Sequence, residues 1–561
     1  MRTLEKWWLR DSSVVCPCYF TARYSTVRPP SAVRPAQRVT VSTSSVRYGH
    51  GSVRAYLERG LQISQGVLVS RRSSKTCRYP PGPTALPLVG NLFDVPAEDS
   101  WLTFIEWSRR YGSDIIHFEV LGQHFVVLNS AQVCKDLFDK RSQIYSDRQQ
   151  TVMAQELTGW HRVMALMAYG DGWRQQRRLL HQHFRQPAVA HYDVHIRKGA
   201  RTLVRLLLES PEKFLRHIRH VTGATTLDVV YAMDIPREGD ARMESVEKAV
   251  DVFAQIADNR GFLVDYIPAL KYLPAWFPGG GFKRQAARWK KSVDYMYEAP
   301  FEEVKQNIKI GKAKPCMATD LMAAYPEWSE DPDVEESIIR VTGSAFAGSD
   351  TTVYTMICFV QVMLLFPNVQ RKAQAELDEV VGKGRLPDTT DPTALPYTSA
   401  LIKELLRWCP IIPLATPHMT SKDDWYNGYF IPAGCIAVGN SWSVLHNEEV
   451  YPDPGAFKPE RFLTPEGTLD ATVPDPMAAF GFGRRICPGR HFALAALFQD
   501  IVHVLAVFNV EKPLDRDGNV VEPKPEWTSR LFRVPKPFKA RFEPRFEGAA
   551  GLLQTAGAAA H

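Results

Sequence analysis

The sequence has few cysteines for its length, and they show no repeated spacing. Nine cysteines are scattered over 561 residues. Only Cys16 and Cys18 are close together, and this pair lacks the two further ligands that a zinc site needs. The odd number and wide separation argue against a disulfide framework and indicate a reducing compartment.

Residues 1–79 are poor in acidic residues and contain no long apolar run. They hold 14 basic and 3 acidic residues. The longest apolar stretch, Val14 to Phe20, is far shorter than the roughly 20 residues that cross a bilayer. We therefore expect no transmembrane anchor here. The basic, hydroxyl-rich composition resembles an organellar transit peptide, and a disordered segment or a wrongly joined first exon remains the alternative.

The rest of the chain is nearly neutral and rich in apolar residues. It carries 54 basic and 58 acidic residues, and 45% of the whole sequence is apolar. A balanced body excludes nucleic acid as the main partner, because phosphate binding needs a basic face on the folded domain. The stiff stretch Tyr79–Pro87 separates the leader from this body. We predict a leader over residues 1–79, one catalytic domain over 80–545, and a disordered tail over 546–561.

Periodicity predicts a mainly α fold with a minor β part. Apolar residues recur at helical spacing through most of the body, whereas short strand-like runs are few and are set off by Pro and Gly. We expect residues 308–333 to be a loop. The predicted elements are a hairpin (117–120 and 125–128), helices (334–365, 370–381 and 399–408) and short strands (within 410–439).

The segment Phe480-Gly-Phe-Gly-Arg-Arg-Ile-Cys-Pro-Gly489 places a cysteine between glycines, directly before a predicted helix. Glycine lets a backbone approach a large planar ligand. The positive end of the helix and nearby N–H groups favour a thiolate, so we expect a depressed pKa for Cys487. A lone cysteine is usually a buried hydrophobic residue, and the surrounding pattern is what favours a ligand.

Five residues of this segment, Phe480, Gly483, Arg485, Cys487 and Gly489, match the pattern F-x-x-G-x-R-x-C-x-G. The sequence therefore resembles the cytochrome P450 superfamily, and the likeness runs from Pro80 to about Phe542. It implies a triangular, mainly helical body with small β-sheets and haem b ligated through Cys487. A thiolate ligand favours O–O cleavage, so the resemblance implies a monooxygenase that uses O2.

The predicted long helix contains Ala347-Gly-Ser-Asp-Thr-Thr352, which matches the oxygen-groove motif of the family. By that resemblance Asp350 and Thr351 relay protons to bound dioxygen. Hydroxyl and carboxyl side chains inside a helix can instead bond to backbone carbonyls or cap a bend. Because glycine and an acid interrupt an otherwise apolar helix at a cost in stability, we favour the functional interpretation.

The resemblance assigns further residues to structural and cofactor-binding roles. Glu404, Arg407 and Arg461 would form a network that fixes the helix 399–408 to the segment before the cysteine. The expected contacts to the haem propionates are Trp173, Arg177, His418 and Arg485. A basic amphipathic helix end is the alternative for Trp173 and Arg177.

The substrate pocket is predicted from position in the family, and its residues are Phe346, Ala347, Ile412, Leu414 and Leu531. They indicate a small, mostly apolar substrate, and sequence alone does not separate a terpenoid from an indole or a polyketide. Stretches such as Leu270–Gly279 and Tyr426–Gly434 resemble fungal secondary-metabolite members of the family. We therefore expect a role in secondary metabolism.

Electrons must come from a partner, because no Gly-rich dinucleotide-binding unit accompanies the domain. By resemblance the partner is an NADPH-dependent cytochrome P450 reductase, with cytochrome b5 as a possible second donor. A docking patch would comprise Arg174, Arg178, Arg484 and Arg490. The family implies the surface of the endoplasmic reticulum, with the aromatic stretch 273–278 as a peripheral membrane contact or a packed segment; the leader leaves a mitochondrial location as the alternative.

Two other functions fit the same cysteine motif. A haem-thiolate isomerase or dehydratase needs no external electrons, and Asp350 with Thr351 argues against it because such enzymes can dispense with proton delivery. A haem-binding sensor or degenerate scaffold would be non-catalytic. Oxygen consumption that depends on NADPH and reductase separates the monooxygenase from both.

Overall fold

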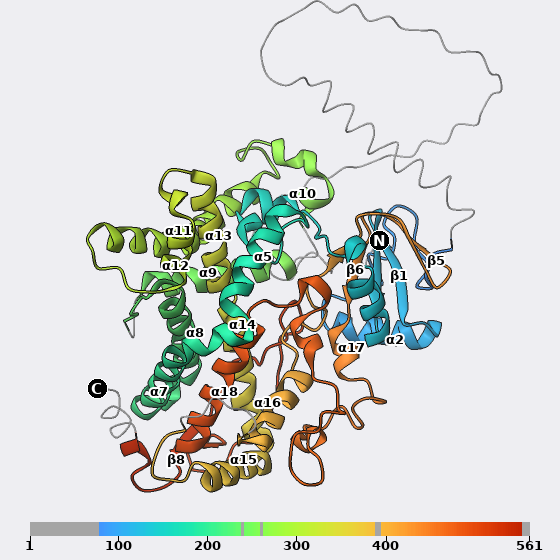
Figure 1. The fold of residues 1–561 in the computed structure, drawn as a ribbon. Coiled ribbons are helices and arrows are strands. Elements are labelled where there is room, and N and C mark those ends of the chain that lie inside the picture. The colour runs from blue at the N-terminus through green and yellow to red at the C-terminus, as the bar shows by residue number, and fades with distance from the viewer. Residues whose placement is uncertain (1–77, 237–239, 259–261, 388–393, 553–561) are drawn as a thin grey trace, which may run out of the picture. The chain divides into compact units, whose positions relative to one another are not determined.

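The computed structural model describes residues 78–236, 240–258, 262–387 and 394–552 (Figure 1). The predicted leader, apart from Arg78 and Tyr79, lies outside the described residues. Contacts divide the chain into two units, and one of them contributes only Leu273–Arg284 to the described part. All other described residues belong to the second unit, which we call the main body.

The segment Leu273–Arg284 carries two exposed aromatic side chains. Trp276 and Phe277 are 79% and 47% exposed, and their rings meet edge to face with centroids 6.0 Å apart. The Arg284 guanidinium donates a hydrogen bond to the Ala275 carbonyl and closes the turn.

The main body is mostly helical. Its helices up to residue 309 are α2 (Ser100–Tyr111), α3 (Ala131–Cys134), α4 (Ser142–Tyr145), α5 (Asp171–Phe184), α6 (Gln186–Val189), α7 (Asp193–Glu209), α8 (Phe214–Tyr231), α9 (Ala241–Asp258), α10 (Leu263–Tyr266) and α11 (Gly281–Lys309), of which α11 begins in the smaller unit. The later helices are α12 (Met317–Ala324), α13 (Pro332–Ala347), α14 (Ser349–Leu365), α15 (Pro367–Val380), α16 (Pro396–Trp408), α17 (Ser441–Leu445) and α18 (Arg490–Val507).

The strands form three small sheets. They are β1 (Ile115–Val120), β2 (Gln123–Leu128), β3 (His418–Met419), β4 (Asp424–Tyr426), β5 (Tyr429–Ile431), β6 (Ile436–Gly439), β7 (Phe508–Glu511) and β8 (Arg541–Pro544). The largest sheet has the order β1-β2-β6-β3, with β2 and β6 parallel and the other pairs antiparallel. The predicted hairpin is confirmed: Leu121 and Gly122 form its turn, and both have positive φ, as a tight hairpin requires.

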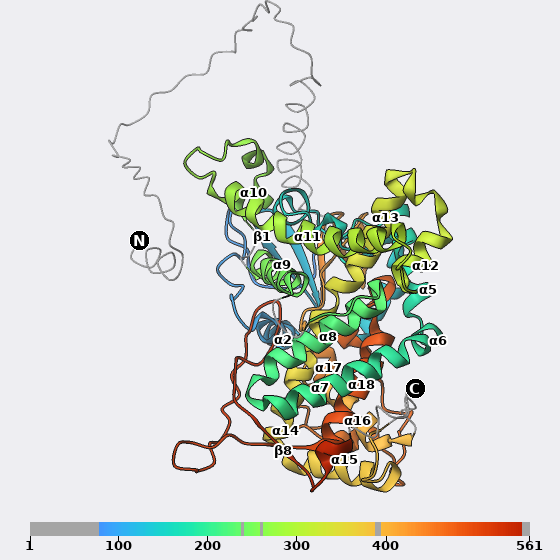
Figure 2. The same ribbon diagram turned by 90° about the vertical axis from the view of Figure 1, so that its left-hand side faces the viewer.

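The core is built around two helices that are apolar on all sides. Nearly all of α14 is buried, and α18 is buried from Ala496 onward. By length and composition Pro332–Leu365 and Arg490–Val507 could cross a membrane, but 78% and 61% of those windows are buried in the fold. A helix that is hydrophobic all round and enclosed by protein is a core helix. Figure 2 shows α7, α8 and α18 side by side in this core.

Three predicted boundaries are wrong. Residues 317–324, expected in a loop, form α12, because Met317 and Leu321 are apolar and buried one turn apart. The helix predicted over 334–365 is divided at Gly348, which ends α13 and precedes α14. Ala549 and Leu552 pack into the large core, although the sequence predicted no core residue in the tail.

Candidate active site

The cysteine loop is shaped by close backbone packing. Gly483 has φ +55, and a Cβ there would lie 2.2 Å from the Phe138 carbonyl oxygen, so only glycine fits. The N–H of Cys487 donates to the Phe480 carbonyl at 2.9 Å. Helix α18 begins three residues after Cys487, with Gly489 at its N-cap. The loop thus presents the sulfur at the start of the helix, as predicted.

The predicted depression of the Cys487 pKa is wrong for the protein alone. Burial raises the pKa of this thiol above its ordinary value, and the Gly489 and Arg490 N–H groups and the charges of Arg177 and Arg490 lower it by less. Desolvation of a thiolate in an apolar setting therefore outweighs the helix terminus. A cation bound to the sulfur would stabilise the thiolate more than these N–H groups and arginines do.

The residues next to Cys487 are less buried than the remainder of α18. Residues 486–495 are half-buried, including the first turns of α18, whereas the helix is buried from Ala496 onward. In the motif 347–352, Ala347 and Thr351 are half-buried and Gly348 is exposed, whereas Asp350 is buried. Each of the two motifs therefore includes residues that are more accessible than the rest of its core helix.

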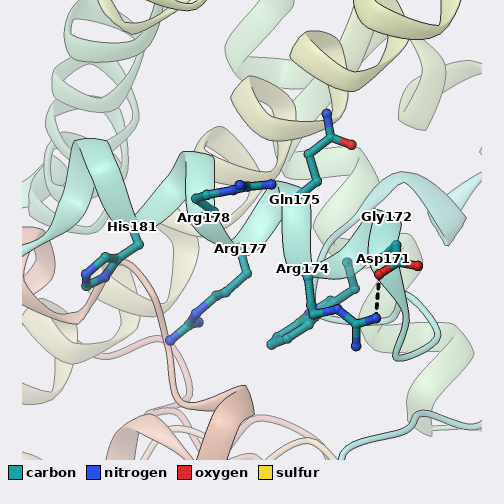
Figure 3. A pocket seen from close by; sticks show the side chains of 8 residues that line it. Asp171, Gly172, Arg174, Gln175, Arg177, Arg178 and His181 are labelled. Carbon is teal, nitrogen blue, oxygen red and sulfur yellow. Dashed lines mark hydrogen bonds and ion pairs between the residues drawn. The ribbon is translucent and has the colours of Figure 1, made fainter.

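Helix α5 lines a pocket of about 710 Å³ (Figure 3). Arg177 extends from it away from Arg178 and toward the C-terminal part of the chain, where its Nη1 donates to the Ile486 carbonyl at 2.5 Å. Arg174 turns the other way and pairs with Asp171. Arg177 of α5 therefore meets the cysteine loop, and its contact with a haem propionate stays a prediction.

Two of the predicted propionate contacts touch each other. The Arg485 guanidinium lies over the Trp173 ring, 4.4 Å from its centroid. Arg485 also donates to the carbonyls of Ser146 and Met167 at 2.7 and 2.8 Å. The Trp173 side chain is buried, and its Nε1–H has no hydrogen-bond partner. A buried donor without an acceptor is costly, so this group fits an acidic or carbonyl oxygen of a ligand.

Sequence reasoning missed Arg148, a third cation in this cluster. It is buried, and its Nη1 donates to the carbonyls of Thr416 and Pro417, both at 2.6 Å. Burial lowers the pKa of Arg148, Arg177 and Arg485, and the Arg485 charge lowers that of Arg148 further. Asp147 is the carboxylate that offsets Arg148 and Arg485. The cluster therefore suits a further anion such as a carboxylate.

His418 lies beside this cluster, but its ring N–H donates to the protein backbone and not to a ligand carboxylate. Its Nδ1 is 2.6 Å from the Tyr145 carbonyl oxygen, which requires the proton on Nδ1. Burial and the charge of Arg148 lower the pKa of His418 well below its usual value. Nε2 of a neutral ring is then an acceptor, which disfavours a hydrogen bond from His418 to a carboxylate. Its contact with haem stays a prediction.

The residues of the oxygen-groove motif lie at the junction of α13 and α14. Thr351 Oγ1 donates back to the Gly348 carbonyl at 3.2 Å, which is the local bonding that the structural alternative described. Asp350 behaves differently: it is 5% exposed, and its Oδ2 has no hydrogen-bond partner. Burial raises its pKa to about 6. This carboxyl group can therefore gain and lose a proton near neutral pH.

A second missed residue, Arg219 on α8, is the cation that acts on Asp350. Its charge lowers the Asp350 pKa, whereas Glu247 and Asp251 on α9 raise it. Arg219 Nε lies 3.9 Å from Glu247, and its guanidinium carbon lies 5.9 Å from the Tyr354 ring centroid. The side chains of Arg219 and Glu247 are 26% and 41% exposed. Glu247 and Arg219 are thus charged groups that lie between the protein surface and the buried Asp350.

The predicted Glu404 network is present. Arg407 donates to both carboxylate oxygens of Glu404, at 2.7 and 2.8 Å, and Arg461 Nε lies 3.0 Å from the same carboxylate. Arg407 also donates to the carbonyls of Leu445 and Ala456. These contacts fix α16 to the segment before the cysteine loop, which is a structural role.

The predicted pocket residues differ in their burial and in what they pack against. Phe346 is fully buried. Ile412 packs against the large core and Leu414 against the cluster beneath β1 and β2. Ala347 and Leu531 are half-buried. Their place in a substrate pocket stays a prediction.

Comparisons with known proteins identify the class. The family model for cytochrome P450 matches residues 80–542. The chain is 40% identical to the tryptamine 4-monooxygenase of Psilocybe cyanescens over 482 residues, which cover 84% of this chain and 94% of that protein. It is 42% identical to cytochrome P450 monooxygenase COX2 of Coprinopsis cinerea over 483 residues, covering 85% and 91%.

A third relative, cytochrome P450 monooxygenase 98 of Postia placenta, is 40% identical over 493 residues, which cover 87% of this chain and 94% of that protein. The fold and the cysteine site define a haem-thiolate oxidoreductase. The chain belongs to the cytochrome P450 family and is a monooxygenase of that family. Such enzymes use O2 and a redox partner.

Proposed function

We propose that this monooxygenase inserts one oxygen atom of O2 into a small, mostly apolar organic compound in secondary metabolism, with haem b as its cofactor. One observation carries the cofactor assignment: buried Arg148 and Arg485, half-buried Arg177 and the unpartnered Trp173 Nε1–H converge beside the cysteine loop. This donor set suits the two carboxylates of haem b. When bound through Cys487, haem supplies oxygen activation.

The residues around Asp350 would deliver protons. A carboxyl group with a pKa of about 6 exists in both forms at neutral pH, so it can pass a proton inward and be reprotonated from outside. Arg219 and Glu247 connect its surroundings to solvent. The Thr351 hydroxyl stands next to it and is half-buried, which suits a second proton carrier.

The proposed electron donor is an NADPH-dependent cytochrome P450 reductase, with cytochrome b5 as a second donor. Arg174 and Arg484 both lie over the Tyr169 ring, 5.4 and 5.9 Å from its centroid, and both are exposed. Arg178 is exposed on the same helix, whereas Arg490 is half-buried and donates to the Cys487 carbonyl. Arg174, Arg178 and Arg484 are the better candidates for an acidic partner surface.

Charge reversal tests the docking surface. Arg178→Glu should slow reduction by the reductase several-fold and make the reduction rate less sensitive to salt, without removing haem. Arg541→Glu, at a distant exposed pair with Glu543, is the control. Equal reduction rates in both variants and the wild type would contradict docking on α5.

We propose the surface of the endoplasmic reticulum as the location, with mitochondria as the alternative suggested by the basic leader. Exposed Trp276 and Phe277 suit a peripheral contact with lipid headgroups. N-terminal sequencing of the native protein, together with fractionation of cells, would show whether residues 1–79 are retained and which membrane holds the enzyme.

Reductase-coupled turnover tests the proposed reaction. The full-length holoenzyme, reductase and NADPH are incubated with indole amines, terpenoids and polyketides; the indole class is included because one relative is a tryptamine 4-monooxygenase. We expect a product heavier by one oxygen atom that carries label from ¹⁸O2. Cys487→Ser should abolish it. A product formed without NADPH and without added oxygen would indicate an isomerase or dehydratase, and binding without any product would indicate a sensor.

A further inference from the structure

Two helices bring cysteines to the same point of the core. Cys358 lies in the second half of α14, and Cys409 directly follows α16. Their sulfur atoms are 2.8 Å apart, although the residues are 51 positions apart in sequence. Both side chains are buried, with 0% and 1% exposure. A disulfide bond is about 2.05 Å long, so closing the pair requires a shift of less than about 1 Å.

The surroundings of the two sulfurs are unequal. Arg533 Nη1 donates to the Cys409 sulfur at 3.8 Å. Its guanidinium is held between the Trp527 and Trp442 rings, with centroid distances of 3.9 and 4.7 Å. Because Arg533 is half-buried and contacts Cys409, we assign Cys409 as the sulfur that an oxidant reaches first.

Cys358 is suited to remain a thiol until it closes the bond. It is embedded among apolar residues of the large core. Burial raises its pKa well above the ordinary value and the neighbouring Cys409 raises it further, whereas the Arg533 charge lowers it by less. Arg533 and Trp527 are half-buried, so side chains that contact or adjoin Cys409 also reach the surface. A small oxidant therefore needs to pass only Arg533 and Trp527 to reach Cys409.

We propose that Cys409 and Cys358 are a redox-sensitive pair that a hydroperoxide converts to a disulfide between α14 and α16. The Cys409 sulfur attacks the distal peroxide oxygen and gives its proton to the departing oxygen, so that the O–O bond breaks, an alcohol or water leaves, and a sulfenic acid remains. The Cys358 sulfur then attacks the Cys409 sulfur, and its proton leaves with the hydroxyl group as water. Two thiols and one hydroperoxide thus give one disulfide, one alcohol or water molecule, and one water molecule.

The disulfide would join two functional helices. Helix α14 carries Asp350 and Thr351 at its start, and α16 carries Glu404 and Arg407. A cross-link that closes a long loop stabilises a fold by restricting the unfolded chain. Oxidation would therefore stiffen the helix that bears the oxygen-groove motif. This proposal does not depend on the substrate or on the redox partner.

The test uses the full-length holoenzyme, reduced and freed of reductant, and treated with increasing hydrogen peroxide. The protein is then denatured in an alkylating reagent and digested with trypsin. We expect a disulfide-linked pair of peptides, 341–371 and 408–422, that appears before Cys134 or Cys435 loses its reactivity. These two cysteines are the internal controls, because they are buried and contact carbonyl oxygens rather than a cation. The unfolding temperature should rise by a few degrees and return after dithiothreitol.

Four variants separate the roles of these residues. In Cys358→Ser we expect Cys409 to accumulate as a sulfenic acid that dimedone labels, whereas in Cys409→Ser we expect no label on Cys358. Arg533→Gln should slow disulfide formation several-fold, and Arg533→Lys should restore part of the rate. The proposal is overturned if Cys358 and Cys409 remain as alkylatable as Cys134 and Cys435 at every peroxide dose. Dimedone labelling of Cys358 alone would equally overturn it.

Discussion

Two of the buried carboxyl groups in the described part of the chain, Glu404 and Asp350, have opposite surroundings. Glu404 is fully enclosed, and both of its oxygens meet arginines within 3.1 Å. Asp350 is almost as buried, but one of its oxygens has no partner and Arg219 acts on it only through its charge. Glu404 is held by a complete set of ion pairs, whereas Asp350 can bind and release a proton.

The difference shows how burial serves structure or chemistry. A buried ion pair with every hydrogen bond made is costly to break and rigid. A buried carboxyl group that lacks some of its hydrogen bonds and counter-charge has a raised pKa. It can then transfer protons near neutral pH, and the protein is less stable for it. The following predictions test this contrast, beginning with the largest effect.

Glu404→Gln should be the most damaging change. It removes the negative charge and leaves Arg407 and Arg461 buried without a counter-charge. We expect a loss of about 3–5 kcal/mol in the free energy of unfolding, together with a low yield of haem-loaded protein. Urea unfolding followed by tryptophan fluorescence measures it.

The matched control is Glu460→Gln, in the turn Pro459–Phe462 that also carries Arg461. Glu460 pairs with Lys372 at 2.6 Å, and both side chains are about half exposed. Exposed pairs contribute at most about 1 kcal/mol, so this variant should be nearly as stable as the wild type. Similar losses in the two variants would refute the distinction between a fixed and a solvated pair.

Asp350→Asn should stabilise the protein at alkaline pH and abolish proton delivery. The folded-state pKa of about 6 exceeds the ordinary value of 3.8, so the wild type loses stability as pH rises from about 4 through 6. The variant has no such loss. Above pH 7 we expect it to be more stable than the wild type by about 1–3 kcal/mol, with no gain at pH 4. Urea unfolding over this pH range tests the sign.

Arg219→Gln and Glu247→Gln should shift the Asp350 pKa in opposite directions. Loss of the Arg219 cation removes a charge that lowers this pKa, whereas loss of the Glu247 carboxylate removes one that raises it. The carboxyl stretching band of Asp350 in infrared difference spectra, with Asp350→Asn as the blank, reports its protonation directly. The acidic limb of kcat/KM should move up in pH for the first variant and down for the second. Shifts of the same sign would exclude the proposed charge path.

Thr351→Ala should have the smallest effect on stability. Its hydroxyl bonds back to the Gly348 carbonyl and is half-buried, so we expect a change below about 1 kcal/mol. Product formed per NADPH should nevertheless fall several-fold, and Thr351→Ser should restore much of it. Unchanged coupling in the alanine variant would restrict Thr351 to helix bonding.

The sequence by itself determined the class of fold, the family and the positions of the site motifs. These are local properties: the period of apolar residues, the glycines around Cys487, and the charges three residues apart at Glu404 and Arg407. Loop 308–333 was misassigned because the apolar pair that makes α12 a helix is too short to stand out among polar residues. The break at Gly348 was missed because one glycine does not reliably end an apolar helix in sequence.

Only the tertiary structure decided what depends on distant segments meeting. Arg148 joins the cation cluster, Arg219 reaches Asp350 from α8, and Cys409 meets Cys358; none of these pairs has a sequence signature, because each joins helices or loops far apart in the chain. Burial likewise raised the pKa of Cys487 and of Asp350. A pKa depends on the dielectric and charges in three dimensions, whereas a motif records only which group is present.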